Sequence, residues 1–379
     1  MNIILIYLNY SMIKNIKSLL LIFTLLFISC EEDDIDSGGI PIIFECNKPS
    51  YSSIPDYDRR DGKYRFYTYS WQEFPQICIN TYEGVSPESK NLIAEVINDG
   101  ENELGLIVPV NVYAFNNGLS DLDQVLSDWS RLKLAENLDF SDYVAAAGVD
   151  WNNLHNGGII ELAHGIFDMP DDENFGSRAR KITYHEFFHV HQNSHRFYFE
   201  DENNFGFNIE REDDHSGIAM VGPVWLEEGG AEFAAIYLSS KKGWVDYNFA
   251  MIEALDDARS VISDAATRND IVSLRDYETS DGIKKVESEN NTTGTSRKFA
   301  YQYTAGSWVF AYLWHLNDNN LQGALTEYYK RLAEIERENI GEGWKIAFET
   351  TFGISVEQFY IDFDKFMLES REDQIAILK

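Results

Sequence analysis

Two histidines and a glutamate stand at a spacing that suits metal-ion chemistry, in the segment YHEFFH at 184–189. Side chains four residues apart lie on one face of a helix, so His185 and His189 can offer two imidazoles to one ion. Glu186 would then lie beside the ion without pointing at it, where a carboxylate can take a proton from water. The two phenylalanines between the histidines indicate a buried helix, and a buried histidine pair without a metal would be costly.

A catalytic zinc ion needs a third protein ligand, and two residues qualify. Catalytic zinc sites use three protein ligands and leave one position open. His195 stands ten residues after His185, which gives the pattern HExxHxxQxxH. This is similar to the metzincin pattern, except that Gln192 replaces the glycine that lets the helix turn sharply. Glu228 is the other candidate, in the segment WLEEGGAEF at 225–233.

The segment around Glu228 resembles the WLxEGxA helix of gluzincins, the aminopeptidase-N-like and thermolysin-like metallopeptidases. The resemblance implies that Glu228 is the third zinc ligand. Glu232 follows one turn later on the same helix face, where it could accept a hydrogen bond from the outer nitrogen of a ligand histidine.

A third segment, YTAGSWVF at 303–310, resembles the YxxG helix start of the same families. In those peptidases the tyrosine stabilises the oxyanion that forms on the scissile carbonyl, and it corresponds to Tyr303 here. A donor placed where charge develops contributes about 2.7–4 kcal/mol to the transition state. Tyr301, two residues earlier, is the competing candidate.

The resemblance covers about residues 150–316, with weaker support to 370. Thirty-eight residues lie between His189 and Glu228, about twice the number in compact gluzincins. The acidic, irregular segment 196–222 accounts for the excess and is interpreted as a loop inserted over the cleft. If this loop displaced Glu228, the metzincin arrangement with His195 would be favoured instead.

The elements that must position these residues can be predicted from periodicity. Alternation predicts strands at 64–71, 76–83 and 107–115, and another strand at 157–167 that would form the sheet edge beside the cleft. Ser86 and Pro87 predict a helix start, and Gly100 would end that helix. The expected helices lie near 120–135, 176–194, 223–240, 245–265, 298–316, 321–336 and 355–370. This order predicts an α+β fold, zincin-like, with a small N-terminal sheet followed by a mostly helical body.

The N-terminus predicts export and lipidation. Residues 1–29 hold two lysines, no acid and the apolar run LLLIFTLLFI, which is too short to span a bilayer and is typical of a signal peptide. FISC followed by EEDD resembles a bacterial lipobox, with Cys30 as the lipidated residue, and the acidic run resembles the surface-sorting tag of Bacteroidota-type lipoproteins. Met12 is an alternative start to Met1.

The expected domains are therefore a lipoprotein signal peptide at 1–29, an acidic tether and irregular lead-in at 30–62, and a metallopeptidase domain at 63–379. Cys46 and Cys78 remain after lipidation, and an exported protein could join them in a disulfide or keep two buried thiols. The localisation expected is the outer membrane, exposed at the cell surface and attached through the lipid.

The composition excludes some classes of partner. The chain has 379 residues and a formal charge of −32, which argues against nucleic acid as a partner. We therefore expect a surface zinc peptidase, with Zn²⁺ as cofactor and a peptide or protein as substrate. The alternatives are a metzincin-type peptidase using His195 and a non-catalytic binding lipoprotein on a peptidase scaffold. The sequence leaves endo- against exopeptidase activity open.

Overall fold

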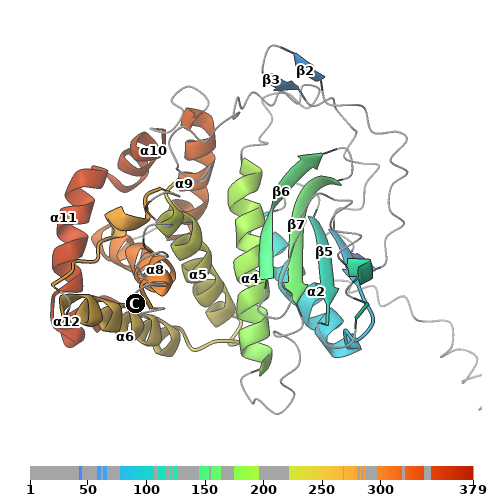
Figure 1. Ribbon diagram of the computed structural model, residues 1–379, viewed down its shortest axis with the longest axis horizontal. Helices are drawn as coiled ribbons and strands as arrows, with labels where there is room; N and C mark the ends of the chain where they lie inside the picture. The colour runs from blue at the N-terminus through green and yellow to red at the C-terminus, as the bar shows by residue number, and fades with distance from the viewer. Residues whose placement is uncertain are drawn as a thin grey trace, which may run out of the picture. The chain divides into compact units, whose positions relative to one another are not determined.

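A five-stranded mixed sheet begins the described part of the chain in the computed structural model (Figure 1). The strand order is β1-β4-β5-β7-β6. The first four of these pair in parallel, whereas β6 pairs antiparallel with β7. The bounds are β1 Ile42–Phe44, β4 Ile77–Thr81, β5 Val110–Phe115, β6 Ala145–Asn152 and β7 His155–Ala163. A separate antiparallel pair consists of β2 Asp58–Arg60 and β3 Lys63–Arg65.

The structure describes part of the chain, and all structural statements below refer to that part. The described ranges are 42–44, 58–60, 63–65, 77–105, 110–116, 145–152, 155–163, 175–195, 222–267, 269–279, 297–317, 321–336 and 343–378, with isolated positions between them. The signal peptide, Cys30, Cys46 and all of the acidic loop 196–222 except Gly222 thus lie outside the described residues, as does most of the helix expected near 120–135.

The sheet edge differs from the prediction. β7 pairs with β5 on one side and with β6 on the other, so the strand expected at the edge is internal. The edge is β6, whose sequence AAAGVDWN holds one β-branched residue and therefore gave little strand signal. At the opposite end of the sheet, Ile42–Phe44 joins as β1, so the lead-in expected to be irregular contributes a strand.

Helix α2, Pro87–Leu104, begins as predicted but ends later. The Ser86 side chain accepts a hydrogen bond from the Ser89 N–H, and Pro87 occupies the first turn. The predicted end at Gly100 was wrong. Gly100 lies inside the helix. Packing explains why this residue is a glycine, because a β-carbon there would come within 2.6 Å of the Phe187 ring. The helix ends instead at Gly105, whose φ of 80° suits glycine.

The rest of the described chain is helical. Its elements are α4 Phe175–Ser194, α5 Val224–Lys241, α6 Tyr247–Ala266, the short 3₁₀ helix η5 Leu274–Tyr277, α8 Arg297–Asn317, α9 Leu321–Glu336, α10 Gly343–Phe352, α11 Val356–Met367 and α12 Arg371–Ile375. Ser355 caps α11, because its side chain accepts a hydrogen bond from the Gln358 N–H. A small sheet followed by a mostly helical body confirms the coarse prediction of the fold.

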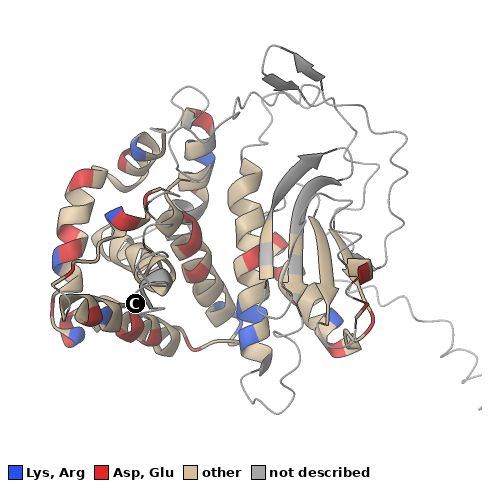
Figure 2. Cartoon of the chain, in the orientation of Figure 1, with Lys and Arg blue, Asp and Glu red and all other residues tan. Residues whose placement is uncertain are grey.

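Helix α4 joins the two parts of the fold (Figure 1). It contacts β6 and β7 on the sheet side and α5 on the helical side. Helix α5 in turn contacts α4, α6 and α8, and its side chains from Trp225 to Leu238 are mostly buried. Arg178, Arg180 and Lys181 place positive charge near the start of α4, and α5 carries acidic residues (Figure 2).

Two glycines allow α5 and α8 to pack at backbone contact. A β-carbon on Gly306 would come within 2.8 Å of both Gly229 Cα and the Trp225 carbonyl oxygen. Glycine inside a helix costs about 1 kcal/mol relative to alanine, so close packing is the reason that both positions are glycine. Gly229 follows Glu228 directly and Gly306 stands one turn after Tyr303, so this contact sets the separation of two predicted site residues.

Among the described residues, no helix combines the length and the apolar character needed to cross a bilayer.

Candidate metal centre

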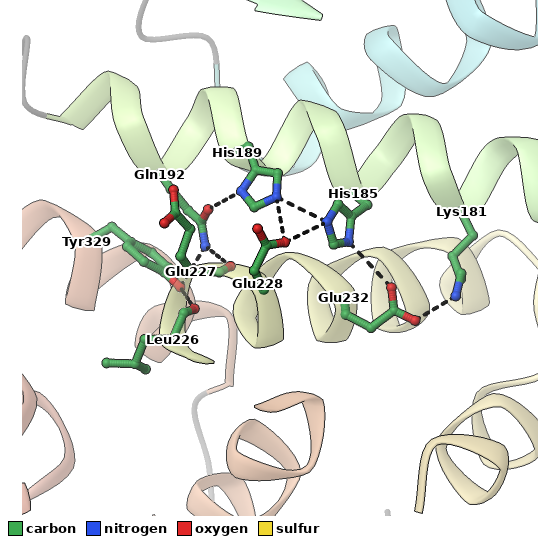
Figure 3. Close-up of polar contacts among 9 residues, drawn as sticks. All are labelled: Lys181, His185, His189, Gln192, Leu226, Glu227, Glu228, Glu232 and Tyr329. Atoms are coloured by element: carbon green, nitrogen blue, oxygen red, sulfur yellow. Dashed lines mark hydrogen bonds and ion pairs between the residues drawn. The ribbon is translucent and has the colours of Figure 1, made fainter. Parts of the chain in front are cut away.

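Three ligand atoms from α4 and α5 form a small, nearly regular triangle (Figure 3). His185 Nε2 and His189 Nε2 lie 3.0 Å apart. Glu228 Oε2 lies 3.4 Å from the first of these nitrogens and 3.3 Å from the second. The two histidines are less than a tenth exposed. Of the residues described, this is the group of His, Cys, Asp and Glu side chains that could hold a metal ion.

The triangle fits a tetrahedral ion bound through nitrogen and oxygen. Zinc bonds of about 2.0–2.2 Å place the ligand atoms of a tetrahedron about 3.3–3.6 Å apart, and the observed edges agree within a few tenths of an ångström. Two imidazoles and a carboxylate are also the ligand set of thermolysin-type catalytic zinc.

The outer nitrogens of both histidines have partners that direct Nε2 into the triangle. His185 Nδ1 lies 3.4 Å from Glu232 Oε2. His189 Nδ1 lies 2.9 Å from Gln192 Oε1. Both partners accept hydrogen bonds, so both Nδ1 atoms donate and both Nε2 atoms present lone pairs to each other. Two facing lone pairs at 3.0 Å require a cation between them, either a proton or a metal ion.

The same carboxylates govern the protonation of the metal-free site. Burial opposes the charge of His185, but hydrogen bonds to Glu228 and Glu232 outweigh it and raise the pKa to about 10. His189 also has a raised pKa: burial opposes its charge, but the charge of Glu228, the hydrogen bond to Glu228 and the charge of Glu186 together outweigh burial. For Glu228, burial is outweighed by the two histidines, which hold its pKa well below the usual value. A metal ion must therefore displace a proton from this site.

Glu232 adds a second carboxylate to the site, and Lys181 compensates the charge of Glu232. The Lys181 Nζ lies 2.6 Å from Glu232 Oε1. Burial opposes the charge of Glu232, but Lys181 and His185 lower its pKa to about 2. With both histidines neutral, as a bound metal requires, the carboxylates of Glu186, Glu228 and Glu232 face the single cation of Lys181, which gives the cluster two net negative charges. A divalent cation neutralises them, as a buried cluster requires.

Glu186 and Tyr303 lie at the same site. Glu186 is 7% exposed, and burial raises its pKa even though both ligand histidines act in the opposite direction. The ring of Tyr303 lies 6.2 Å from the ring of His185, centroid to centroid. Burial, followed by the charges of Glu228 and Glu186, raises the pKa of Tyr303, so its hydroxyl stays protonated at neutral pH. Tyr301 instead is buried, with its ring 5.8 Å from the ring of Tyr277, centroid to centroid.

His195 lies apart from the triangle. Its Nε2 is 3.1 Å from His191 Nε2, in a second buried histidine pair on α4. Burial lowers the pKa of both, to about 4 for His195, so the pair is neutral. In the described part of the chain their Nδ1 atoms have no hydrogen-bond partner, unlike those of His185 and His189.

Sequence reasoning missed Lys181 and the role of Gln192. Lys181 stands four residues before His185, and Gln192 stands three residues after His189. These spacings put each on the face of its histidine. That signal was available, but nothing in the sequence shows which α5 groups they meet.

Cys78 in β4 is disulfide-bonded. The other two cysteines, Cys30 and Cys46, lie outside the described residues.

A scan of family models and searches of curated proteins and solved structures found nothing that matches this chain.

Proposed function

We propose that this chain is a zinc-dependent peptidase of the gluzincin type. The observation that carries the proposal is the triangle of His185 Nε2, His189 Nε2 and Glu228 Oε2, with Glu186 and Tyr303 beside it. The ligand set, the outer partners of both histidines and the two net negative charges all favour a zinc ion. When bound there, zinc would supply Lewis acidity, which polarises a carbonyl and makes water more acidic.

Two side chains perform the proton transfer and the charge stabilisation in this proposal. Glu186 is buried and adjacent to the ligands, so its carboxylate accepts the proton of the attacking water and passes it to the leaving amine. Tyr303 keeps its proton and donates a hydrogen bond to the oxyanion that forms on the scissile carbonyl. These are the roles that the resemblance to gluzincins implies.

The arrangement of elements supports a zincin-like fold and an extended peptide as substrate. Helix α4, which carries both histidines, contacts β6, and β6 is the edge strand of the sheet. An edge strand can pair with an extended chain through its backbone. A peptide or protein segment bound along β6 would lie next to the ligand-bearing helix.

The location follows from the N-terminal sequence. We propose that residues 1–29 are removed, that Cys30 is lipidated, and that the acidic run EEDD directs the chain to the outer surface of the outer membrane. The enzyme would thus act on peptides or proteins outside the cell.

The test of the reaction is Glu186→Gln. This change removes the general base and leaves the three ligands, so we expect cleavage of an unbiased peptide mixture to fall by about 10²–10⁴-fold. Zinc content, measured on the same protein, should stay at one ion per chain. Full activity of the variant would refute the mechanism. Bound zinc with no turnover by the unaltered chain on any peptide would support a non-catalytic binding protein instead.

A further inference from the structure

Gln192 uses both ends of its amide at the metal centre. It is 1% exposed and lies one turn after His189 on α4. Its Oε1 accepts from His189 Nδ1 at 2.9 Å. Its Nε2 donates to the Glu227 carbonyl at 2.9 Å and to the Tyr329 hydroxyl at 2.8 Å (Figure 3). The amide therefore connects a ligand histidine on α4 with the backbone of α5 and a side chain of α9.

The surroundings permit only one orientation of this amide. A backbone carbonyl can only accept, so the atom facing Glu227 must be the donor, Nε2. The Tyr329 hydroxyl donates to the Leu226 carbonyl at 2.8 Å, so it too accepts from Gln192. A reversed amide would set its oxygen against the Glu227 carbonyl oxygen. Oε1 therefore faces His189, and His189 must carry its proton on Nδ1.

The space for this connection is made by a glycine. A β-carbon on Gly230 would collide with the Tyr329 hydroxyl and would approach Gln192 Nε2 to 3.1 Å. Gly230 is the second of the adjacent glycines in α5, and its partner Gly229 serves the contact with α8. The two glycines thus serve different neighbours, and Gly230 belongs to the Gln192 connection.

We propose that Gln192 is the positioning residue of His189. It holds the imidazole with Nδ1 toward α5 and with Nε2 in the triangle, while Tyr329 and Glu227 hold the amide. The inference rests on the metal site of the proposed function and does not require peptidase activity.

The two ligand histidines are then positioned by different chemistry. His185 faces the carboxylate of Glu232, which Lys181 neutralises. His189 faces a neutral amide, which adds no charge to a cluster that already contains three carboxylates. An outer glutamate at both histidines would leave one more buried negative charge without a partner.

The test compares Gln192→Met with Gln192→Glu in the full chain. Methionine keeps the length but removes the acceptor, whereas glutamate keeps an acceptor for His189 and loses both donors. We expect Gln192→Met to weaken zinc binding by about 10–100-fold, measured by competition with a chelator, and to change the visible spectrum of the Co²⁺-loaded chain. Gln192→Glu should recover most of the affinity and the cobalt spectrum while lowering the melting temperature, because its losses are on the α5 and α9 side.

Gln374→Met is the matched control. Gln374 is also fully buried, with its amide donating to the Phe366 carbonyl and accepting from Arg259, but it lies on α12. The Gln374→Met substitution should lower the melting temperature and leave the zinc affinity and the cobalt spectrum unchanged. The inference would be overturned if Gln192→Met had the same zinc affinity and the same cobalt spectrum as the unaltered chain. That result would leave the proposed function intact. An unaltered chain that binds neither zinc nor Co²⁺ would overturn both, and one that binds zinc without cleaving peptides would overturn the peptidase alone.

Discussion

Each group of the triangle is held by another helix, either directly or, for His189, through Gln192 of its own helix. His185 depends on Glu232 of α5, His189 depends on Gln192 and through it on α5, and Glu228 faces both histidines of α4. This mutual support explains how two imidazoles with facing lone pairs and a carboxylate can lie together in a buried site. At the scale of single residues, the outer partners therefore distinguish the histidines of the triangle from His191 and His195, whose Nδ1 atoms have no partner among the described residues.

The choice between Glu228 and His195 as third ligand can be tested by metal content. Glu228→Ala removes one vertex of the triangle, so we expect zinc to be lost on dialysis, with a lower melting temperature than that of the unaltered, zinc-loaded chain. His195→Ala removes one member of the His191–His195 pair, whose Nε2 atoms lie 3.1 Å apart. Because this pair lies apart from the triangle, zinc should be retained. The reverse pattern would establish the metzincin arrangement.

Tyr303 gives a prediction on pH dependence. Its pKa is raised above the usual value of about 10, mainly by burial, so the hydroxyl stays protonated throughout pH 6–9 and can donate to an oxyanion as proposed. Tyr303→Phe should lower kcat by about 10²–10³-fold and leave zinc content unchanged. The shape of the pH profile between pH 6 and 9 should be the same in both proteins. A basic limb in that range that disappears in Tyr303→Phe would show that the tyrosine ionises there and would contradict this assignment.

At the scale of elements, helix α5 is the one on which the site depends most. It carries Glu228 and Glu232 toward α4, and the Glu227 carbonyl toward Gln192. On its other side it meets α8 at backbone contact, which fixes the distance from Glu228 to Tyr303. The tryptophan before the glutamates, Trp225, stacks on Phe359 and donates to the Tyr360 hydroxyl, so the start of α5 is also held by α11.

The contact between α5 and α8 predicts a combined loss of stability and activity. In Gly306→Ala the new methyl group overlaps the backbone of α5, so we expect the free energy of unfolding to fall by about 1–3 kcal/mol in urea titrations. Peptide cleavage should fall as well, because Tyr303 moves away from Glu228. Gly176→Ala on α4 is the control: its β-carbon would meet only the flexible end of Arg180, and stability should be unchanged or slightly higher. Equal stability of the two variants would show that the helices can separate without cost.

At the scale of the whole molecule, the net charge and the proposed lipid attachment bear on which partners the chain can meet. The formal charge of −32 attracts cations and repels polyanions, which agrees with a divalent metal as cofactor and argues against nucleic acid. The described part begins with β1 at Ile42, twelve residues after Cys30. The proposed lipid on Cys30 would attach the chain through its N-terminal side.

Attachment through Cys30 can be tested by fractionation. Cys30→Ser removes the thiol that would accept the lipid, so we expect the chain to leave the membrane fraction and to lose incorporation of a labelled fatty acid. Zinc content should not change, because the metal site lies far along the chain in α4 and α5. Retention of Cys30→Ser in washed membranes would show that another segment provides the attachment.

The local order of the sequence determined a good part of this protein. Helical periodicity predicted α4, α5, α6, α8, α9 and α11 to within a few residues, because their apolar positions recur every three to four residues whatever they pack against. The HExxH spacing paired His185 with His189 for the same reason, since i and i+4 always share a helix face.

Long-range packing decided the rest. Gly100 was expected to end a helix, but it is buried against Phe187 of α4. The strand predicted at 157–167, which corresponds to β7, was expected at the edge, but pairing with β7 makes β6 the edge. Gln192 counted only as a poor replacement for glycine, yet it joins His189 to α5 and α9. Side-chain types and local spacing show which groups are able to bind a metal, whereas only the approach of α5 to α4 decides that Glu228, and not His195, completes the triangle.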